Sequence, residues 1–170
     1  MATEGKKWPY VAAGFAFGLL AMGVGPLMAQ GDCKAVLATA GKMVTSATHI
    51  YSTTSRSGKE HTMEMIFLPG VYYSRTDNST WSSAPMSAQE RAETLQSKTW
   101  ADNMACKYVK DEAVNGEMAG VYSWHDAATG GDTQIWISKA KGVPLRQEVD
   151  GARQTHMSMR YEYGSVKPPI

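Results

Sequence analysis

The stretch DTQIWISKAKGVPLRQEVDGARQTHMSMRYEYGSVKP, from Asp132 to Pro168, decides the fold of this chain. Apolar and polar residues alternate in three runs of it, at 134–138, 145–149 and 154–163. Alternation with a period of two predicts β-strands that have one apolar face and one polar face. Gly142-Val143-Pro144 separates the first two runs, and Asp150-Gly151 is a hairpin signal between the second and third. The stretch therefore predicts an antiparallel meander with one face in water.

The faces of this meander follow from the same alternation. In the second run, Leu145, Gln147 and Val149 are expected on the apolar face. The opposite face collects charged residues of both signs, which we expect to form cross-strand ion pairs: Arg146, Glu148, Arg160 and Glu162.

Residues 1–29 have the pattern of an export signal. Lys6 and Lys7 precede an uncharged apolar run at 10–25, and Ala29 stands before a predicted cleavage site. The alternative is a membrane anchor, but the run is shorter than the roughly 20 residues that span a bilayer, and Pro26 closes it. We therefore expect a single mature domain at 30–170, located in the periplasm and without a stable membrane span.

Charge and cysteine content narrow the classes of partner. The chain has 17 Lys and Arg against 16 Asp and Glu, and no basic cluster, so nucleic acid is not an expected partner. Its two cysteines, Cys33 and Cys106, both follow the predicted signal. In an oxidising compartment such a pair is most simply a disulfide, and the absence of a CxxC motif makes a metal or redox site the weaker alternative.

The rest of the mature chain alternates helices and strands. A helix is expected from Cys33 to Thr48 with Asp32 as its N-cap, and a second from Ser87 to Ala105, where Ser87 and Glu90 form a capping box. The remaining strands are expected at 49–56, 60–68, 71–75, 80–82, 108–114 and 117–125. Helices packed on one face of such a sheet make an α+β fold. We expect a curled antiparallel sheet of about eight strands, an incomplete barrel that wraps one or two helices.

These features resemble the periplasmic lipoprotein-carrier (LolA/LppX-like) half-barrel family. The segment IWISKAKGVPLRQEVDG, at 135–151, is similar to a strand–turn–strand of the carrier. The stretch from Cys106 to Pro168, with its VNGE turn and VYSWH strand, resembles a group of exported bacterial proteins. The resemblance implies a concave sheet that opens onto a hydrophobic cavity, with the second helix partly covering its mouth.

No catalytic or metal-binding motif stands out. The four histidines, His49, His61, His125 and His156, lack metal-ligand spacing, and no nucleophile elbow is present. We expect no catalytic residue, no metal and no cofactor, so the chain is predicted not to be an enzyme. The rival hypothesis is a small hydrolase that uses His61 or His125.

The remaining unusual feature is a set of methionine and aromatic residues with matching strand parity. Such side chains adapt to varied apolar partners. The functional interpretation is a cavity for a lipid or another apolar small molecule, and the alternative is a plain core beneath the helices. A third possibility is a scaffold whose sheet edge binds an envelope protein. The predicted cavity residues are Met63, Met65, Phe67, Tyr122, Trp124, Met157, Met159 and Tyr161.

Overall fold

The computed structural model describes residues 29–95, 105–126 and 130–169, with side chains from residue 34 onward. These ranges contain two helices, α1 (Ala29–Thr45) and α2 (Ala88–Leu95). They also contain nine strands: β1 (Thr48–Arg56), β2 (Lys59–Leu68), β3 (Gly70–Thr76), β4 (Ser82–Met86), β5 (Lys107–Val114), β6 (Glu117–Asp126), β7 (Gly131–Ser138), β8 (Pro144–Gly151) and β9 (Thr155–Tyr163).

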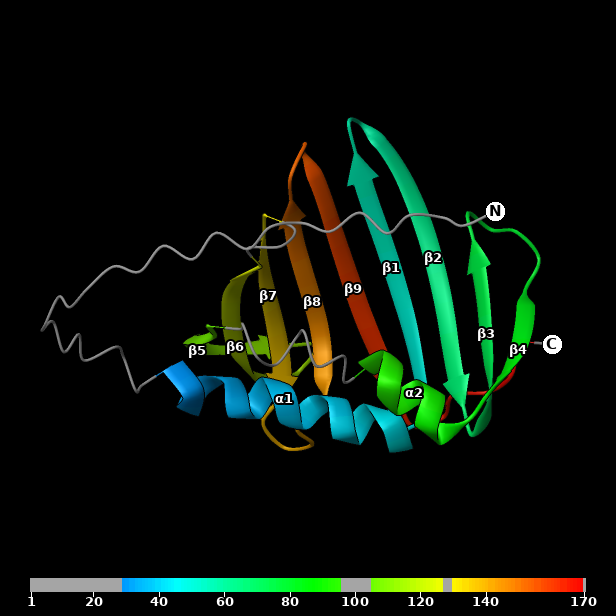
Figure 1. Cartoon of the computed structure of the whole chain (residues 1–170), viewed down its shortest axis with the longest axis horizontal. Coiled ribbons are helices and arrows are strands. Elements are labelled where there is room, and N and C mark those ends of the chain that lie inside the picture. The colour runs from blue at the N-terminus through cyan, green and yellow to red at the C-terminus, as the bar shows by residue number, and fades with distance from the viewer. Residues whose placement is uncertain (1–28, 96–104, 127–129, 170) are drawn as a thin grey trace, which may run out of the picture.

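All nine strands belong to one antiparallel sheet, in the order β4-β3-β2-β1-β9-β8-β7-β6-β5. The sheet has edges at β4 and β5, so it does not close into a barrel. Figure 1 shows it curling around α1 and α2, which lie across one end of the strands. We call the face toward the helices the inner face and the other the outer face. The predicted α+β class and incomplete barrel are confirmed.

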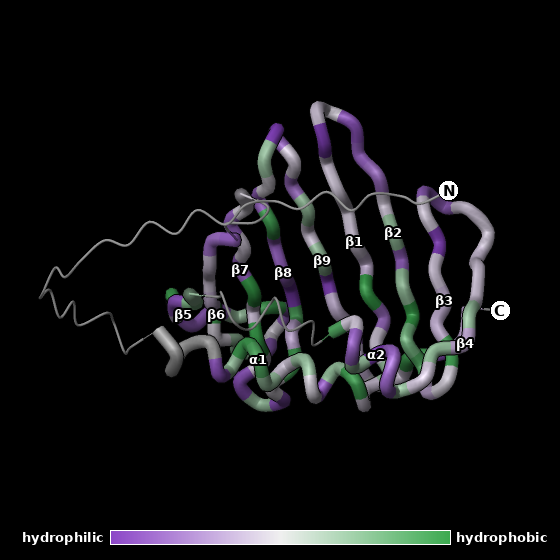
Figure 2. The backbone as a smooth tube through the Cα atoms, viewed as in Figure 1, coloured by the Kyte–Doolittle hydropathy of each residue, from purple (hydrophilic) through white to green (hydrophobic). Residues whose placement is uncertain are grey.

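The stretch from Asp132 to Pro168 supplies the centre of this sheet. β9 pairs with β1 along their whole length, from Thr48 opposite Tyr163 to Arg56 opposite Thr155. The C-terminal meander is thereby joined to the N-terminal strands. Figure 2 shows apolar residues gathered at the helix-covered ends of the central strands, whereas the β1–β2 and β8–β9 hairpin tips are hydrophilic.

Two hairpin turns have the usual positive φ values, and the turn predicted at Asp150-Gly151 is wrong. Ser57-Gly58 and Asn115-Gly116 connect strand pairs with positive φ at both residues, as tight hairpins require. Asp150-Gly151 is not a turn, because Gly151 is still paired with Thr155 across β8 and β9. The ladder continues because Asp150 Oδ1 lies 2.7 Å from His156 Nδ1 on the opposite strand. The turn follows at 152–154.

The strand predicted at 80–82 also differs from the structure. Strand β4 begins only at Ser82 and continues past the predicted end through Pro85, which lies opposite Val71. β4 is an edge strand. A proline, which has no backbone N–H to donate, is tolerated at such an edge.

The helices start or end elsewhere than predicted. α1 begins at Ala29, so Asp32 lies inside the helix rather than at its N-cap, because Ala29 and Gln30 are good helix formers. The capping box of α2 is confirmed: Glu90 N donates to Ser87 Oγ at 3.1 Å, and Ser87 N donates to Glu90 Oε2 at 2.7 Å. α2 ends at Leu95, residues 96–104 lie outside the described residues, and Ala105 is not helical.

A register shift changes the face of Leu145. Trp136 pairs with Arg146 while Ile137 pairs with Pro144, so Leu145 is an extra residue between them. Such a bulge turns a side chain to the other face. Leu145 therefore packs beside Trp136 on the outer face, and the prediction that it shares a face with Gln147 is wrong.

Three apolar clusters hold the fold together. The filled cluster, on the inner face beneath α1, consists of Val36, Cys106, Trp124, Ile135 and Ile137. The methionine cluster, on the same face beneath both helices, consists of Met43, Ile50 and Tyr161 with the partly buried Met65, Phe67, Leu95, Met159 and Tyr163. The outer cluster consists of Ala119, Val121 and Trp136 with Val114 and Leu145.

A lysine attaches α1 to the β7–β8 turn. Lys42 Nζ donates a hydrogen bond of 2.6 Å to the carbonyl of Lys141. The neighbouring Gly142 has a φ of +64°, a backbone conformation that favours glycine. The lysine thus links α1 to a turn whose shape requires glycine.

The charged residues of β8 and β9 pair along the strands rather than across them. Arg146 pairs with Glu148, Arg160 Nη1 lies 3.1 Å from Glu162 Oε1, and the two arginines oppose each other. Each guanidinium also lies over an aromatic ring, which draws it toward its own side of the ladder. The predicted cross-strand pairing is therefore wrong.

Candidate functional site

Strand register brings the eight predicted cavity residues onto one face of the sheet. Ile50 pairs with Met65 on one side and Tyr161 on the other. Further along, Gln147 pairs with Met159 and Ile135, and Ile135 pairs with Tyr122. Side chains directly opposite in a ladder lie on the same face. The inner face therefore carries Met63, Met65, Phe67, Tyr122, Trp124, Met157, Met159 and Tyr161.

The eight predicted cavity residues differ in how deeply their side chains are buried. Trp124 and Tyr161 are buried, Met65, Phe67, Tyr122, Met157 and Met159 are half-buried, and Met63 is 41% exposed near the β1–β2 tip. Trp124 belongs to the filled cluster, while Met65, Phe67, Met159 and Tyr161 belong to the methionine cluster. The eight residues are thus divided between the closely packed filled cluster and the partly exposed methionine cluster.

A cavity of about 300 Å³ lies between the helices and β7–β9. This volume is at the lower end of the range for small-molecule sites, and most of its wall is apolar. Of the eight predicted residues, Tyr161 lines it. The remaining walls come from residues not singled out in the sequence: Thr39, Ala40, Met43, Thr94, Leu95, Ile135, Pro144 and Gln147.

Part of this wall could have been found from the sequence. Ile135 and Gln147 share the period-two pattern of the meander, so their face was available. The helix residues were not available, because where α1 and α2 cross the sheet depends on tertiary packing. Ala40 leaves space where a larger side chain at this helix position would fill the cavity.

The cavity has a polar edge at β8 and β9. The Tyr161 hydroxyl donates to Gln147 Oε1 at 3.0 Å and lies 3.6 Å from Met159 Sδ. Burial raises the pKa of Tyr161 well above its ordinary value, so the hydroxyl remains a donor at neutral pH. The site can therefore bind a mainly apolar molecule with a polar group at one end.

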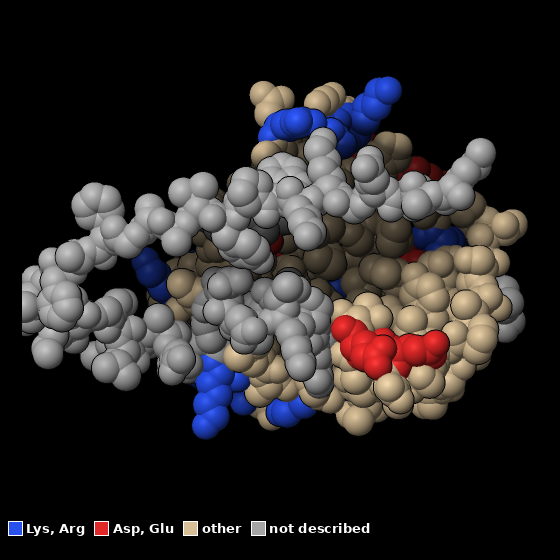
Figure 3. All heavy atoms as spheres, in the orientation of Figure 1, with Lys and Arg blue, Asp and Glu red and all other residues tan. Residues whose placement is uncertain are grey.

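Helix α2 contributes Thr94 and Leu95 to the cavity wall and is attached to the sheet through Arg91. This side chain is 6% exposed, lies 4.9 Å over the Phe67 ring and donates to the Ser46 carbonyl at 2.7 Å. Burial lowers the pKa of Arg91, as desolvation disfavours its charge. Figure 3 shows acidic side chains over α2 on the opposite, solvent-facing side, where Glu90 and Glu93 are exposed.

The histidines of the rival hydrolase hypothesis lie in exposed pairs with carboxylates. His61 Nδ1 is 2.8 Å from Asp77 Oδ2, and His125 Nδ1 is 2.7 Å from Asp132 Oδ1. The two rings are 62% and 58% exposed. Across residues 34–95, 105–126 and 130–169, no hydroxyl or thiol is hydrogen-bonded to either ring, so neither pair forms a nucleophile–base arrangement.

A metal site and a membrane-spanning helix were also considered for the same described part of the chain. Its His, Cys, Asp and Glu side chains form no group of three or more that could hold a metal ion. Neither described helix is long and apolar enough to cross a membrane.

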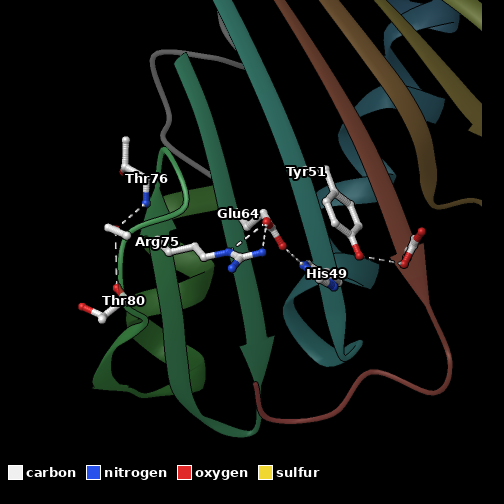
Figure 4. Close-up of polar contacts among 8 residues, drawn as sticks. His49, Tyr51, Glu64, Arg75, Thr76 and Thr80 are labelled. Carbon is white, nitrogen blue, oxygen red and sulfur yellow. Dashed lines mark hydrogen bonds and ion pairs between the residues drawn. The ribbon is translucent and has the colours of Figure 1, made fainter. Parts of the chain in front are cut away.

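The outer face carries a polar network on β1–β3. Figure 4 shows Arg75 and His49 pointing at Glu64 from the two neighbouring strands. Arg75 Nε donates to Glu64 Oε1 at 2.9 Å, and His49 Nε2 lies 3.2 Å from Glu64 Oε2. Tyr51 stacks on His49 at 4.0 Å, and the Arg75 guanidinium lies 4.8 Å over Trp81. This network stabilises the outer surface opposite the methionine cluster.

The sheet edge at β5 is the other distinctive surface. Tyr108 and Val109 on this strand are 47% and 48% exposed, and Met118 on β6 is 50% exposed. A second, more open cavity of about 430 Å³ lies between α1 and this edge. The edge combines exposed apolar side chains with a strand that, in the described ranges, has β6 as its one strand neighbour, which is the arrangement that strand-adding partners use.

Comparison with known proteins gives similarity in structure alone. No protein-family model matches the sequence, and no curated protein matches it. MucB is similar in structure, with a TM-score of 0.53 and 12% identity over 82% of this chain and 61% of MucB. MucB in the Pseudomonas aeruginosa MucA/MucB complex gives 0.52 and 12%, over 82% and 59%.

Two mycobacterial proteins are matched over more of their own length. LprF from Mycobacterium bovis has a TM-score of 0.50 and 9% identity, over 84% of this chain and 95% of LprF. The Mycobacterium tuberculosis lipoprotein LppX has 0.48 and 9%, over 86% and 100%. The likeness confirms the lipoprotein-carrier-like half-barrel fold. This chain spans 61% of the length of the MucB chain that it matches.

Proposed function

We propose that the mature chain is an exported binding protein that holds an apolar, lipid-like ligand between its sheet and helices. The observation that carries this proposal is the cavity bounded by α1, α2 and β7–β9, with its mostly apolar wall. The export pattern at 1–29 supports a location in the periplasm, after cleavage of the predicted signal.

The energetics favour such a ligand. Burying an acyl chain gains about 0.8 kcal/mol for each CH₂ group. Met43, Met65 and Met159 lie beside or near the cavity, and methionine adapts its shape to an irregular partner. An acyl chain could lie partly in the cavity and partly along the methionine cluster, and each buried CH₂ group would add to its affinity.

A cavity-filling substitution tests the proposal. Ala40→Phe places a ring in the cavity, so we expect the affinity for a fluorescent fatty acid to fall at least roughly tenfold, since excluding two CH₂ groups suffices for this. Ala38→Phe is the matched control, because Ala38 is exposed on the same helix and does not line this cavity. Equal affinities for Ala40→Phe and the unmodified protein, with both folded, would contradict the proposal.

The β5 edge favours a second candidate function, an envelope interaction module. MucB forms a complex with MucA in the structure named above. In this chain, the exposed Tyr108, Val109 and Met118 favour an extended partner segment paired to β5. Crosslinking from a photoreactive residue at 109 in envelope extract tests this. We expect a captured protein that excess unlabelled chain competes away, and capture of no protein, or capture that the competitor leaves unchanged, would argue against it.

We also propose that the chain has no catalytic activity. The His61–Asp77 and His125–Asp132 pairs are exposed and lie outside the cavity lining. In a screen of esterase and amidase substrates, we expect no turnover above background. A turnover that is lost in His61→Ala or His125→Ala would favour the hydrolase instead.

A further inference from the structure

Arg91 carries the only charge among the buried residues of the part of the chain that the structure describes. It projects from α2 toward the sheet, with its guanidinium over the ring of Phe67. Glu90 and Glu93, the acidic residues of the same helix, are exposed to solvent, and the Glu90 carboxylate accepts a hydrogen bond from Ser87 N. The helix therefore directs its cation inward and its anions outward.

The partners of this guanidinium are neutral. Arg91 Nη2 donates to the Ser46 carbonyl and lies 3.3 Å from Thr48 Oγ1, while Arg91 Nε is buried without a hydrogen-bond acceptor. No carboxylate in the described ranges lies within 4.0 Å of it. A buried charge with neutral partners is costly, so an anion that reached Arg91 would be bound favourably.

A second polar group without a partner comes from β9. The Tyr163 hydroxyl is buried and makes no hydrogen bond. Tyr163 lies opposite Thr48 in the β1–β9 ladder, and Thr48 is the residue that Arg91 Nη2 contacts. Burial raises the pKa of the Tyr163 hydroxyl, and the Arg91 guanidinium opposes that rise. A guanidinium and a hydroxyl, both able to donate, thus lie together where one acceptor would satisfy both.

This pair adjoins the cavity. Leu95, which lines the cavity, is four residues beyond Arg91, or about 6 Å along α2. Tyr161, which also lines it, precedes Tyr163 by two residues on the same face of β9, or about 7 Å. A chain in the cavity could therefore extend past Leu95 to the pair.

We infer that the ligand is an anionic amphiphile whose carboxylate is bound by Arg91 and Tyr163 while its chain occupies the cavity. This inference rests on the proposed function and adds the chemistry of the ligand's head group. A planar guanidinium matches a carboxylate, and charge-assisted hydrogen bonds are stronger than neutral ones in a buried site. A fatty acid fits this description, whereas the fatty alcohol of equal length lacks the charge.

The test compares the dissociation constants of palmitate and hexadecanol for the unmodified chain by competition with a fluorescent fatty acid. We expect palmitate to bind roughly 10- to 100-fold more tightly, the range for a charge-assisted hydrogen bond. Equal affinities would overturn the inference and leave the proposed function standing. Binding of neither would overturn both. Acetate binding as tightly as palmitate would show a small-anion site and contradict the inference.

Two variants separate a head-group site from a merely structural role. Arg91→Lys keeps the positive charge but removes the planar fork, and Tyr163→Phe removes the hydroxyl alone. Each should lower the palmitate affinity roughly tenfold and leave the hexadecanol affinity unchanged. Tyr51→Phe is the matched control, because its hydroxyl lies on the outer face near Glu162. An equal loss for acid and alcohol in both variants would mean that Arg91 only docks α2, which contradicts the inference.

Discussion

The inner face of the sheet has two regions built from different residue types. The filled cluster packs Val36, Ile135 and Ile137 around Trp124 and Cys106, and all five are 7% exposed or less. The methionine cluster combines its three buried members with five partly buried side chains. Branched side chains have few rotamers and pack in one way, whereas methionine has many. The first region is suited to hold the fold and the second to accommodate a guest.

The outer face repeats this division. Behind the filled cluster lies the apolar outer cluster, so the strands β6 and β7 are buried on both faces. Behind the methionine cluster lies the network of Glu64, Arg75 and His49. A strand buried on both faces gains more from packing than one with a polar outer face. The stability of the molecule should therefore depend more on β6 and β7 than on β1 and β2.

The largest effect is expected from the predicted disulfide. Cys106 is buried in the filled cluster with Val36, which lies three residues after Cys33 on α1. The two cysteines are 73 positions apart, and closing such a loop stabilises by roughly 3–5 kcal/mol. We expect reduction of the exported protein to lower its free energy of unfolding in urea by this amount. Two free thiols in the oxidised protein, found by mass mapping, would contradict the pairing.

A truncation in each cluster tests the division directly. Ile137→Ala in the filled cluster should cost about 2–5 kcal/mol, because a buried branched side chain leaves a cavity that collapses poorly. Met65→Ala in the methionine cluster should cost roughly 1 kcal/mol, because its side chain is half-exposed and its neighbours adjust. Equal losses in urea denaturation would remove the distinction between the clusters.

Ligand binding should show the opposite order. Met159→Trp together with Met65→Trp crowds the methionine cluster, and we expect a hydrophobic dye or fluorescent fatty acid to bind about tenfold more weakly. Ile137→Ala, measured at a temperature where it is folded, should leave this affinity within about twofold, since Ile137 does not line the cavity. A reversed result would place the ligand in the other region.

The outer network should have a smaller effect on stability. Glu64 accepts from Arg75 and lies beside His49, with its side chain 19% exposed. Glu64→Gln should lower the free energy of unfolding by about 1–2 kcal/mol, because Arg75 loses a charged acceptor in a partly buried site. The exposed Glu60 on the same strand is the control, and Glu60→Gln should change stability by less than about 0.5 kcal/mol. Indistinguishable variants would show that the network contributes nothing measurable.

The smallest effect concerns pH and the β6–β7 side of the molecule. Hydrogen bonds from Lys141 and from the Ser138 hydroxyl lower the pKa of Glu117. The folded state thus favours the carboxylate, so its contribution is complete above the unfolded pKa of about 4.3 and is lost as the pH falls through the lower folded value. Melting temperatures between pH 7 and pH 3 should fall less steeply for Glu117→Gln than for the unmodified chain. Parallel curves would contradict this.

The sequence predicted the features that depend on local alternation. The strand faces of β2, β6 and β9 were predicted correctly, because each side chain there follows its own period of two. Leu145 was misplaced because the bulge opposite Trp136 and Ile137 leaves no signature in that alternation. The continuation of β4 through Pro85 was not predicted, because a proline is tolerated only in an edge strand and the sequence does not show which strand is at the edge.

The site was less predictable than the sheet. Tyr161 was identified, but Ala40 and Leu95 were not, because the cavity exists only where α1 and α2 cross the strands. Arg91 was also missed. A charged residue on a mostly polar helix is expected to be exposed to solvent. The burial of Arg91 depends on its contacts with Phe67 and Ser46, which are distant in sequence.

The central claim is that the cavity between helices and sheet holds a lipid-like molecule in the exported protein. Native mass spectrometry of the chain purified after export tests this most directly. We predict a mass above that of the polypeptide, and an acyl-containing compound in the organic extract of the unmodified chain and of Ala38→Phe. Ala40→Phe should lack both. A bare polypeptide mass for the unmodified chain, unchanged after incubation with fatty acids, would contradict the account.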